Sequence, residues 1–496
     1  MGSAKNVASG VVWSTLVNLI NAIYGFISVP ILINYFGKAE YGIIGLAMSV
    51  NVYMQLMDLG FNSTNVRFFS NWLAKKDWSH TNKLFQTSLA FYGVIGILNA
   101  LALILVSFFT KELFHLSAEQ DVILKNLLYI LSVSAIVSWF VSCFSQLISA
   151  TENVAWIQRY TLLPKLLQLA ILFITVFSHL SILWYFLLTT FSLFSIIPFY
   201  MRKISKETPF VKFLPKFDKK TFKEIIPYCL NIFSFSIFQF SFYNLRPVFL
   251  GIQGSVESVA DYRVLNGVIT VVSIFGSSFM GVLLPSAAKV VATHNKEAFY
   301  KIAYDGTKYI TIVLCFCCFG MMTICSEVLE LYVGKSFLYL IPWLHVWLVC
   351  TLGVHIQAIS SLILSGSDIR TITYSTVVAS ITGLLISWFA IPYYQVGGVV
   401  MAFVVYQIVQ LVFYYFYYWR VKMNISSWRV FSYSFIPYVI LGAALYFIIN
   451  QFVVFDASNW ILLFVKGILF SVIYLFFILF LLTDNDKMYF RSLIKS

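Results

Sequence analysis

The sequence predicts an all-α protein that crosses a membrane many times. Hydrophobic residues make up 60% of the 496 residues and charged residues only 11%, whereas soluble domains have about 45–50% apolar and 25% charged residues. Apolar runs of about 20 residues recur along the whole chain, and each is long enough to cross a hydrocarbon core about 30 Å thick as a helix. A water-soluble core could not bury this much apolar surface, so the bilayer is expected to be the solvent for most of the chain.

The first apolar run predicts a membrane helix rather than a signal peptide. It extends from Val7 to Ile33 and lacks the short apolar core and the small-residue cleavage site of a signal peptide. Windows of about 19 residues indicate roughly fourteen spans in all. Their starts are expected near Val7, Tyr41, Phe85, Leu127, Leu162, Leu180, Ile225, Tyr262, Tyr309, Leu340, Ile372, Gly397, Val430 and Trp460.

The basic residues predict the orientation of these spans. If the N-terminus is cytoplasmic, about 26 of the 33 basic residues fall in inside loops. The others are Lys38, Lys111, Lys125, Arg246, Arg263, Lys335 and Lys466. We therefore expect a multi-pass protein of the cell inner (cytoplasmic) membrane with both termini in the cytoplasm. We attribute the net charge of +13 to the basic loops that set the orientation of the spans, because no soluble basic domain is present that would bind nucleic acid.

Two similar halves are expected within the chain. Pro30 in the first span precedes a short outer loop and Tyr41, while Pro247 at the end of the seventh span precedes a similar loop and Tyr262. Six spans separate the copies, which gives them the same orientation, as in transporters with parallel repeats. The predicted division is an N-terminal lobe over residues 1–200 (spans one to six), a basic cytoplasmic linker over 201–224, a C-terminal lobe over 225–420 (spans seven to twelve), and the last two spans with a cytoplasmic tail over 421–496.

Four spans carry polar residues at helical spacing along one face. The candidates for lining a substrate cavity are Asn18 and Asn21 in the first span, Asn51 and Gln55 in the second, Gln239, Tyr243 and Arg246 in the seventh, and Arg263, Asn266 and Thr270 in the eighth. Amide and small side chains also hold helices together in lipid, so helix packing is the alternative for each residue. Stripes at matching places in both halves favour the cavity, because an amide that faces lipid is costly.

The sequence does not predict an enzyme. The longest outer loop, near Thr110 to Asp121, has only about a dozen residues and carries no cluster of catalytic groups. Walker, H-E-x-x-H and G-x-S-x-G motifs are absent from the sequence. The cysteines lie in or at the ends of apolar segments without the paired spacing and histidines of a zinc site. We therefore expect no cofactor and no metal.

Two segments carry a resemblance to a known family. The run VPILINYFGKAEYGIIGLAMSV, followed by LMDLGFNSTNVRFF, resembles the polysaccharide transporter family of the multidrug, oligosaccharidyl-lipid and polysaccharide (MOP) exporter superfamily. That family has a proline near the end of the first span, a short loop closing on Glu-Tyr-Gly, and an Asp-x-Gly followed by a basic residue. The matching positions are Pro30, Glu40, Tyr41, Gly42, Asp58, Gly60 and Arg67. The resemblance implies a MATE-like fold of two six-helix lobes plus two C-terminal helices.

The resemblance also implies a function. Members of this family resemble flippases, so the chain is expected to move an undecaprenyl-pyrophosphate-linked oligosaccharide, the repeat unit of an O-antigen, a capsule or an exopolysaccharide, by alternating access. Its partners would be the lipid-linked oligosaccharide, membrane lipids and the polysaccharide polymerase or ligase machinery, and the protein would be a monomer. Lipid II flippases carry several arginines on the first helix, where this chain has only Asn18 and Asn21. The alternatives are a cation-coupled drug or metabolite antiporter, whose cleft should hold a carboxylate near the midplane, and a membrane glycosyl polymerase.

Three residues are candidates for conformational change or coupling. Asp58 and Arg67 flank Gly60, a predicted helix stop, and are expected to form a charge-pair latch. The alternative is a pair of solvated charges at a helix end. His355 is expected near the midplane of the tenth span, where it would either couple proton movement or serve as a packing residue.

Two arginines are expected to hold the substrate. Arg246 and Arg263 break the positive-inside pattern, because they lie at the outer ends of spans seven and eight. A guanidinium group binds phosphate oxygens in a bidentate fashion and keeps its charge, so the pair could bind the pyrophosphate. The alternative is that they reach the interface and pair with Glu257 or Asp261.

Overall fold

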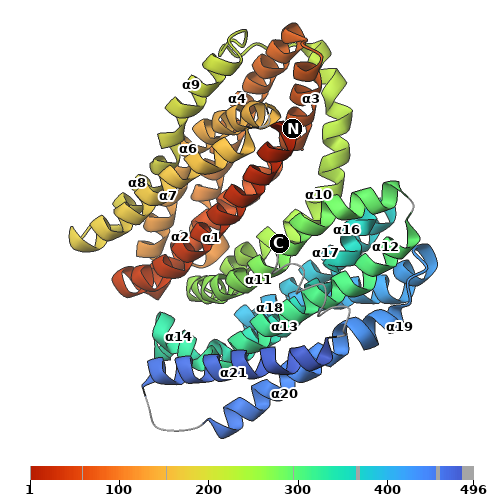
Figure 1. The fold of residues 1–496 in the computed structure, drawn as a ribbon. Helices are drawn as coiled ribbons and strands as arrows, with labels where there is room; N and C mark the ends of the chain where they lie inside the picture. The colour runs from red at the N-terminus through yellow and green to blue at the C-terminus, as the bar shows by residue number, and fades with distance from the viewer. Residues whose placement is uncertain are drawn as a thin grey trace. The chain divides into compact units, whose positions relative to one another are not determined.

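Every element that the structure describes is a helix (Figure 1). The structure is a computed structural model and describes residues 2–58, 60–151, 153–293, 295–364, 369–453 and 458–482. The all-α fold expected from the composition is therefore confirmed. The helices form two compact units, Met1–Arg263 with Ser387–Gly398, and Val264–Ile386 with Val399–Ser496.

The first unit consists of helices built from the first six predicted spans and the seventh. Its elements are α1 (Gly2–Phe36), α2 (Lys38–Met54), η1 (Gln55–Asp58), α3 (Phe61–Ala74), α4 (Trp78–Phe108), α5 (Thr110–Phe114), α6 (Ala118–Ala150), α7 (Val154–Phe177), α8 (Ile182–Ser192), η2 (Leu193–Ile196), α9 (Ile197–Glu207) and α10 (Lys219–Gln253). Helix α4 packs on α6, α1 packs on α7, and α10 packs on α2, α3, α4 and α5. The predicted lobe boundary at the linker stays a prediction, and in the structure α10 packs with the helices that precede the linker.

The second unit contains most of the remaining helices. Its elements are α12 (Lys296–Lys301), η3 (Ile302–Gly306), α13 (Thr307–Thr323), α14 (Cys325–Val333), η4 (Lys335–Leu340), α15 (Ile341–Thr351), η5 (Leu352–Ile356), α16 (Gln357–Leu364), α18 (Val396–Val412), η6 (Phe413–Lys422), α19 (Ser427–Arg429), η7 (Val430–Phe435), α20 (Ile436–Phe452) and α21 (Asn459–Leu481). Two long helices, α11 (Val256–Ala292) and α17 (Ile369–Tyr394), contribute residues to both units, and the first residues of α18 also belong to the first unit. Helix α13 packs on α15, α20 and α21.

The number of spans is close to the predicted number but is not confirmed. In the described residues, 11 helices are long and apolar enough to cross a membrane, or up to 12 if the bent pair of α2 and α3 counts as one span. Helices α10 and α11 occupy the places of the predicted seventh and eighth spans and have 35 and 37 residues, but they are not among the 11. The count of fourteen stays a prediction.

The second predicted span is broken in the middle. The segments Lys38–Asp58 and Phe61–Ala74 meet at an angle of 44°. Gly60, with φ at 80°, precedes α3 in the left-handed region, which glycine adopts without steric cost. The helix stop expected at Gly60 is therefore confirmed, and Asp58 ends η1 just before α3 begins.

The basic linker packs against the first unit instead of extending into water. The ring of Phe213 lies 5.7 Å from the rings of both Phe85 and Phe144, which belong to α4 and α6. The backbone N–H groups of Lys212 and Asp218 donate to side chains of α4 at 2.8 and 3.1 Å. Apart from Lys203, the lysines of the linker are exposed, so its charges face outward while its backbone packs on α4.

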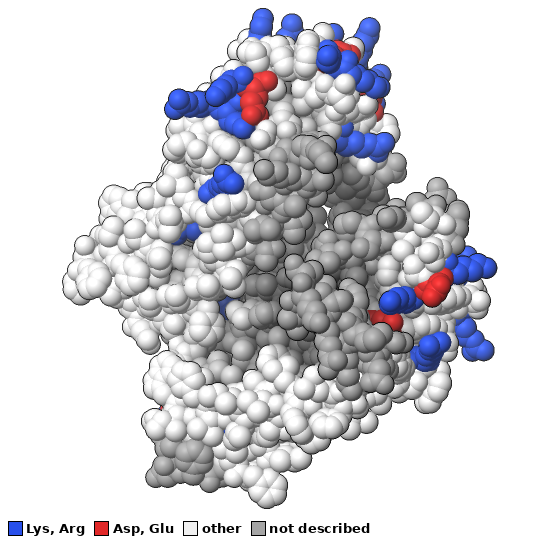
Figure 2. Space-filling model, in the orientation of Figure 1, with Lys and Arg blue, Asp and Glu red and all other residues white. Residues whose placement is uncertain are grey.

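Charge is distributed unevenly over each unit. Figure 2 shows that lysine and arginine side chains gather at the end of the first unit where α3 and α9 end, and on the second unit near α12 and α19. Most of the remaining described surface of each unit in this view is white and belongs to uncharged residues. Large apolar side chains are exposed on many helices, such as Phe177 at 79% and Phe447 at 68%. An apolar flank with basic ends is the arrangement expected of helices embedded in lipid.

Candidate functional site

The close approach of α2 to α11 depends on two glycines of α2. A Cβ atom at Gly42 would lie closer than 3.0 Å to the backbone carbonyl of Val256, and one at Gly45 would lie 2.6 Å from Cδ of Arg263. Only residues without a side chain let the two backbones come this near. The Tyr-Gly step that contributes to the family resemblance therefore positions the first turns of α11, including Arg263, directly against α2.

Arg263 lies on an aromatic ring of α2. Its guanidinium carbon is 5.6 Å from the ring centre of Tyr41, and Tyr41 is only 4% exposed. Within the described residues, the Nη1 atom of Arg263 is buried and has no hydrogen-bond partner. An arginine with an unused N–H donor can bind an oxygen of an anionic group.

Arg246 is enclosed by aromatic rings of α10 and α11. It is 2% exposed, and its guanidinium carbon lies 4.7 Å from the ring centre of Phe242, 5.4 Å from that of Tyr243 and 5.9 Å from that of Tyr262. Contacts of a cation with ring faces stabilise it where water is excluded. The structure thus brings together two of the predicted cavity residues, Tyr243 and Arg246.

An ion pair lies at the N-terminus of α2. Nζ of Lys38 is 2.7 Å from Oδ1 of Asp261, and the two side chains are 29% and 7% exposed. This contact joins the α1–α2 turn to the first turns of α11. Asp261 thus has a lysine as one partner, and its pairing with an arginine stays a prediction.

The other stripe residues are on the expected helices, with differing exposure. In the first unit Asn18, Gln55 and Gln239 are exposed, while Asn21 and Asn51 are half-buried. In the second unit Asn266 is half-buried, and the exposed Thr270 donates its hydroxyl to the Asn266 carbonyl at 2.6 Å. Cavity lining by these residues stays a prediction.

Asp58 and Arg67 have separate partners in this structure. Asp58 accepts hydrogen bonds from the backbone N–H of Asn62 at 3.0 Å and from the Tyr92 hydroxyl at 2.8 Å. The guanidinium carbon of Arg67 lies 4.2 Å from the ring centre of Tyr228 on α10. The structure does not bring the two charges together, because the break at Gly60 turns α3 toward α10. The latch stays a prediction for another conformation.

A chain of buried polar groups continues from Asp58 into the first unit. The Tyr92 hydroxyl accepts from Nε2 of Gln146 at 2.8 Å, and Oε1 of Gln146 accepts from Nδ2 of Asn65 at 2.8 Å. These groups come from η1, α4, α6 and α3. Sequence reasoning found Asp58 but missed the other three, because their helices are far apart in the chain.

His355 is surrounded by protein. It is 1% exposed, and Nδ1 lies 2.8 Å from the Leu352 carbonyl while Nε2 lies 2.7 Å from the Tyr415 hydroxyl. A carbonyl only accepts, so Nδ1 carries a hydrogen, and when the ring is neutral its Nε2 accepts from the Tyr415 hydroxyl. Both ring nitrogens therefore have partners, which favours the packing alternative for this histidine.

Two lysines of the second unit are buried, which was not expected from the sequence. Nζ of Lys466 on α21 lies 2.6 Å from Oε1 of Glu327 on α14, with side chains 10% and 5% exposed. Lys308 is 1% exposed and lies 2.9 Å from the Tyr433 hydroxyl and 3.6 Å from Asp305. Lys466, which the sequence placed among the basic residues outside the inner loops, lies inside α21. A single lysine within a long apolar run was the signal that could have identified it.

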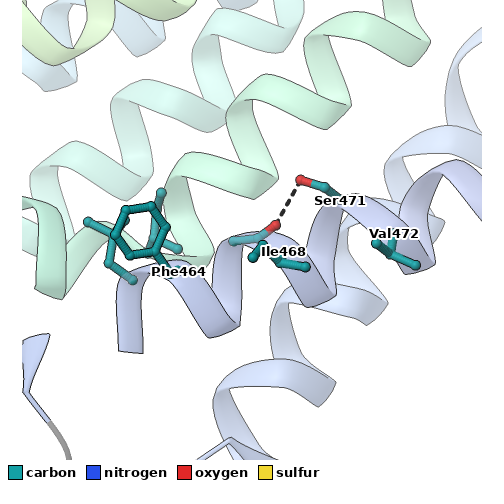
Figure 3. Close-up of a pocket in the computed structure, with 7 residues that line it drawn as sticks. Phe464, Ile468, Ser471 and Val472 are labelled. Carbon is teal, nitrogen blue, oxygen red and sulfur yellow. Dashed lines mark hydrogen bonds between the residues drawn. The ribbon is translucent and has the colours of Figure 1, made fainter. Parts of the chain in front are cut away.

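An apolar groove of about 370 Å³ follows one face of α21 (Figure 3). It is lined by Ile324, Leu463, Phe464, Gly467, Ile468, Ser471 and Val472. The one hydroxyl in this lining, that of Ser471, donates to the carbonyl of Gly467 in its own helix at 2.7 Å. No side-chain donor in this lining is therefore left for a phosphate.

Comparison with known proteins identifies the fold. The family described as "Polysaccharide biosynthesis protein" matches residues 7–291, which is more than half of the chain. The sequence matches no curated protein closely enough to identify a relative. The matched range includes α2, α10 and the arginine-bearing turns of α11.

Three solved structures share the architecture. "Lipid II flippase MurJ, inward closed conformation" has a TM-score of 0.74 at 14% identity and covers 98% of this chain and 100% of its own. An inward-facing multidrug resistance MATE family transporter of the MOP superfamily gives 0.60 at 12% identity, with 89% and 100% covered. The MATE multidrug transporter DinF-BH gives 0.62 at 14% identity, with 84% and 96% covered. The predicted MATE-like fold is therefore confirmed.

Proposed function

We propose that this chain, which belongs to the polysaccharide biosynthesis protein family, is a flippase that moves an undecaprenyl-pyrophosphate-linked oligosaccharide across the cell inner membrane by alternating access. The observation that carries the proposal is the placement of Arg263, which rests on Tyr41 with a buried N–H donor available. Arg263 as a whole is half-buried, and an ionisable side chain among the helices of a membrane protein is usually functional.

The chemistry of the substrate fits this arrangement. A pyrophosphate offers several charged oxygens to guanidinium forks, while amide and hydroxyl groups of the polar stripes can bind sugar hydroxyls. The polyprenyl tail stays in lipid, where the exposed apolar flanks of the helices lie. The basic ends of the units support cytoplasmic termini, by the positive-inside rule.

A test of the proposal is to delete the gene and to analyse the lipid-linked oligosaccharides by mass spectrometry. A flippase defect should accumulate complete repeat units on the cytoplasmic side and remove the surface glycan. A glycosyl polymerase defect would instead leave exported single repeats. An unchanged lipid pool with intact surface glycan would contradict the flippase. Altered drug resistance alone would favour the cation-coupled antiporter.

The arginine fork can be tested by a substitution that keeps the charge. Arg263→Lys is expected to lower glycan export by about tenfold to a hundredfold, because a lysine loses the bidentate contact and charged hydrogen bonds are worth about 1.5–3 kcal/mol. Export is measured as surface glycan per molecule of protein in the membrane. Arg159→Lys is the matched control, since Arg159 is exposed and stacks 4.7 Å from Trp13. Equal export by both variants would remove Arg263 from substrate binding.

A further inference from the structure

We propose that Asp58 binds and releases a proton, and that this reverses the chain of hydrogen bonds that leads from Asp58 through Tyr92 and Gln146 to Asn65. Each of the three links is 2.8 Å long. Tyr92, Gln146 and Asn65 are no more than 1% exposed, whereas Asp58 is half-buried, so water reaches the carboxylate end of the chain. The inference concerns the coupling ion and holds whichever substrate crosses the membrane.

The chain of hydrogen bonds has a single direction when Asp58 is ionised. A carboxylate has no hydrogen to give, so the Tyr92 hydroxyl donates to Asp58. The Tyr92 oxygen accepts from Nε2 of Gln146, and Oε1 of Gln146 accepts from Nδ2 of Asn65. Every donor therefore points toward the negative charge.

A proton on Asp58 allows the opposite direction. The carboxylic O–H then donates to the Tyr92 oxygen, the Tyr92 hydroxyl donates to Oε1 of Gln146, and Nε2 of Gln146 donates to Oδ1 of Asn65. This requires both amides to turn over, which exchanges an oxygen for an NH₂ group of similar size. In the described part of the chain, Oδ1 of Asn65 is buried without a hydrogen-bond partner, so no bond of that oxygen opposes the reversal.

Asp58 can change its charge because no cation is bound to it. In the described residues its hydrogen bonds come from Tyr92 and from the backbone of Asn62 and Gly60, and it forms no ion pair. The titratable groups that face it are Tyr92 from α4 and Cys229 from α10. Neutralising one member of a buried ion pair would leave the other charge unpaired at high cost, and this site avoids that cost.

The same carboxylate holds the break between α2 and α3. The N–H of Asn62 faces the charge at the positive end of α3, where an anion is favoured. A proton taken up from water weakens this contact. The same proton reverses the hydrogen bonds that connect Asp58 to α4, α6 and α3. Protonation is therefore linked to the 44° bend between the two helices and to the packing of α3, α4 and α6.

The test uses infrared difference spectra of the purified full-length protein in lipid nanodiscs between about pH 4 and pH 8, a window that begins near the ordinary carboxyl pKa. The wild type should show a carboxyl band that appears on acidification, together with a change in amide side-chain bands at the same midpoint. Asp58→Asn should lose both signals. Tyr92→Phe should keep the carboxyl band and lose the amide change, because the chain is cut, and Gln146→Met should do the same.

Asp77→Asn serves as the control for these spectra. Asp77 precedes α4 and accepts from the backbone N–H of His80 at 3.1 Å, which holds the pKa of its carboxyl below its ordinary value. Its removal should therefore leave the bands unchanged. A wild type without a carboxyl band that depends on Asp58 would overturn the proton site, and a carboxyl band without the amide change would overturn the reversal of the chain. Because neither readout requires transport, both results are independent of the flippase proposal.

Discussion

Lys466→Met is expected to lower the free energy of unfolding of the protein by about 3–5 kcal/mol, because it leaves the carboxylate of Glu327 buried and unpaired. The pair is 2.6 Å long and almost fully enclosed between α14 and α21. Glu327 has a second contact, from the hydroxyl of Ser326 at 2.8 Å, but a single neutral donor is too weak to replace the lysine. Thermal unfolding in detergent, followed by loss of monodisperse protein, measures the change.

The chain provides a matched control for this pair. Lys335 lies 3.6 Å from Glu330, but its side chain is 82% exposed, and exposed pairs contribute about 0–1 kcal/mol. Lys335→Met should therefore unfold close to the wild type. A double variant, Lys466→Met with Glu327→Leu, should regain most of the loss, since a buried pair can be replaced by apolar side chains. Equal stability of the Lys466 and Lys335 variants would show that the buried pair does not matter.

Gly42→Ala is expected to destabilise the first unit. Its Cβ would collide with the backbone carbonyl of Val256, and a backbone cannot move aside as a flexible side chain can. Overpacking of this kind costs about 1–3 kcal/mol, occasionally more. It should also reduce glycan export, because the first turns of α11 also carry Arg263.

Gly25→Ala is the control for this prediction. A Cβ at Gly25 would meet nothing within 4 Å, and alanine is favoured over glycine in a helix by about 1 kcal/mol. We therefore expect Gly25→Ala to be neutral or stabilising. If both alanine variants unfold at the wild-type temperature, the close approach of α2 to α11 does not limit stability.

Features that depend on local sequence were predicted correctly. The apolar runs identified the helices, and Gly60 identified the break before α3, because a left-handed residue after a helical run is a property of a few neighbouring residues. The Tyr41–Gly42 step contributed to the family resemblance, and the structure explains the glycine through its contact with Val256. Arg246 and Arg263 were chosen as candidates because they lie on the side opposite to most basic residues, and their role in binding the substrate stays a prediction.

Features that depend on distant segments were not predicted. Lys466 and Glu327 are far apart in sequence, and nothing in either neighbourhood indicates the other. The partners of Asp58 come from α4, α6 and α3, so only the fold could show that Tyr92 replaces Arg67 beside the carboxylate. Proximity in sequence suggested the charge pair, and the break in the helix separated it.

The linker between α9 and α10 has a consequence for protein engineering. Phe213 packs on rings of α4 and α6, and the adjacent backbone is hydrogen-bonded to α4. The segment is therefore a packed part of the fold and not a loose connection. An epitope tag, a fluorescent protein or a protease site placed there would have to displace these contacts, although insertion is usually tolerated in exposed connections. The basic charge and polar composition that make this segment look like the safest insertion point in the chain are therefore misleading.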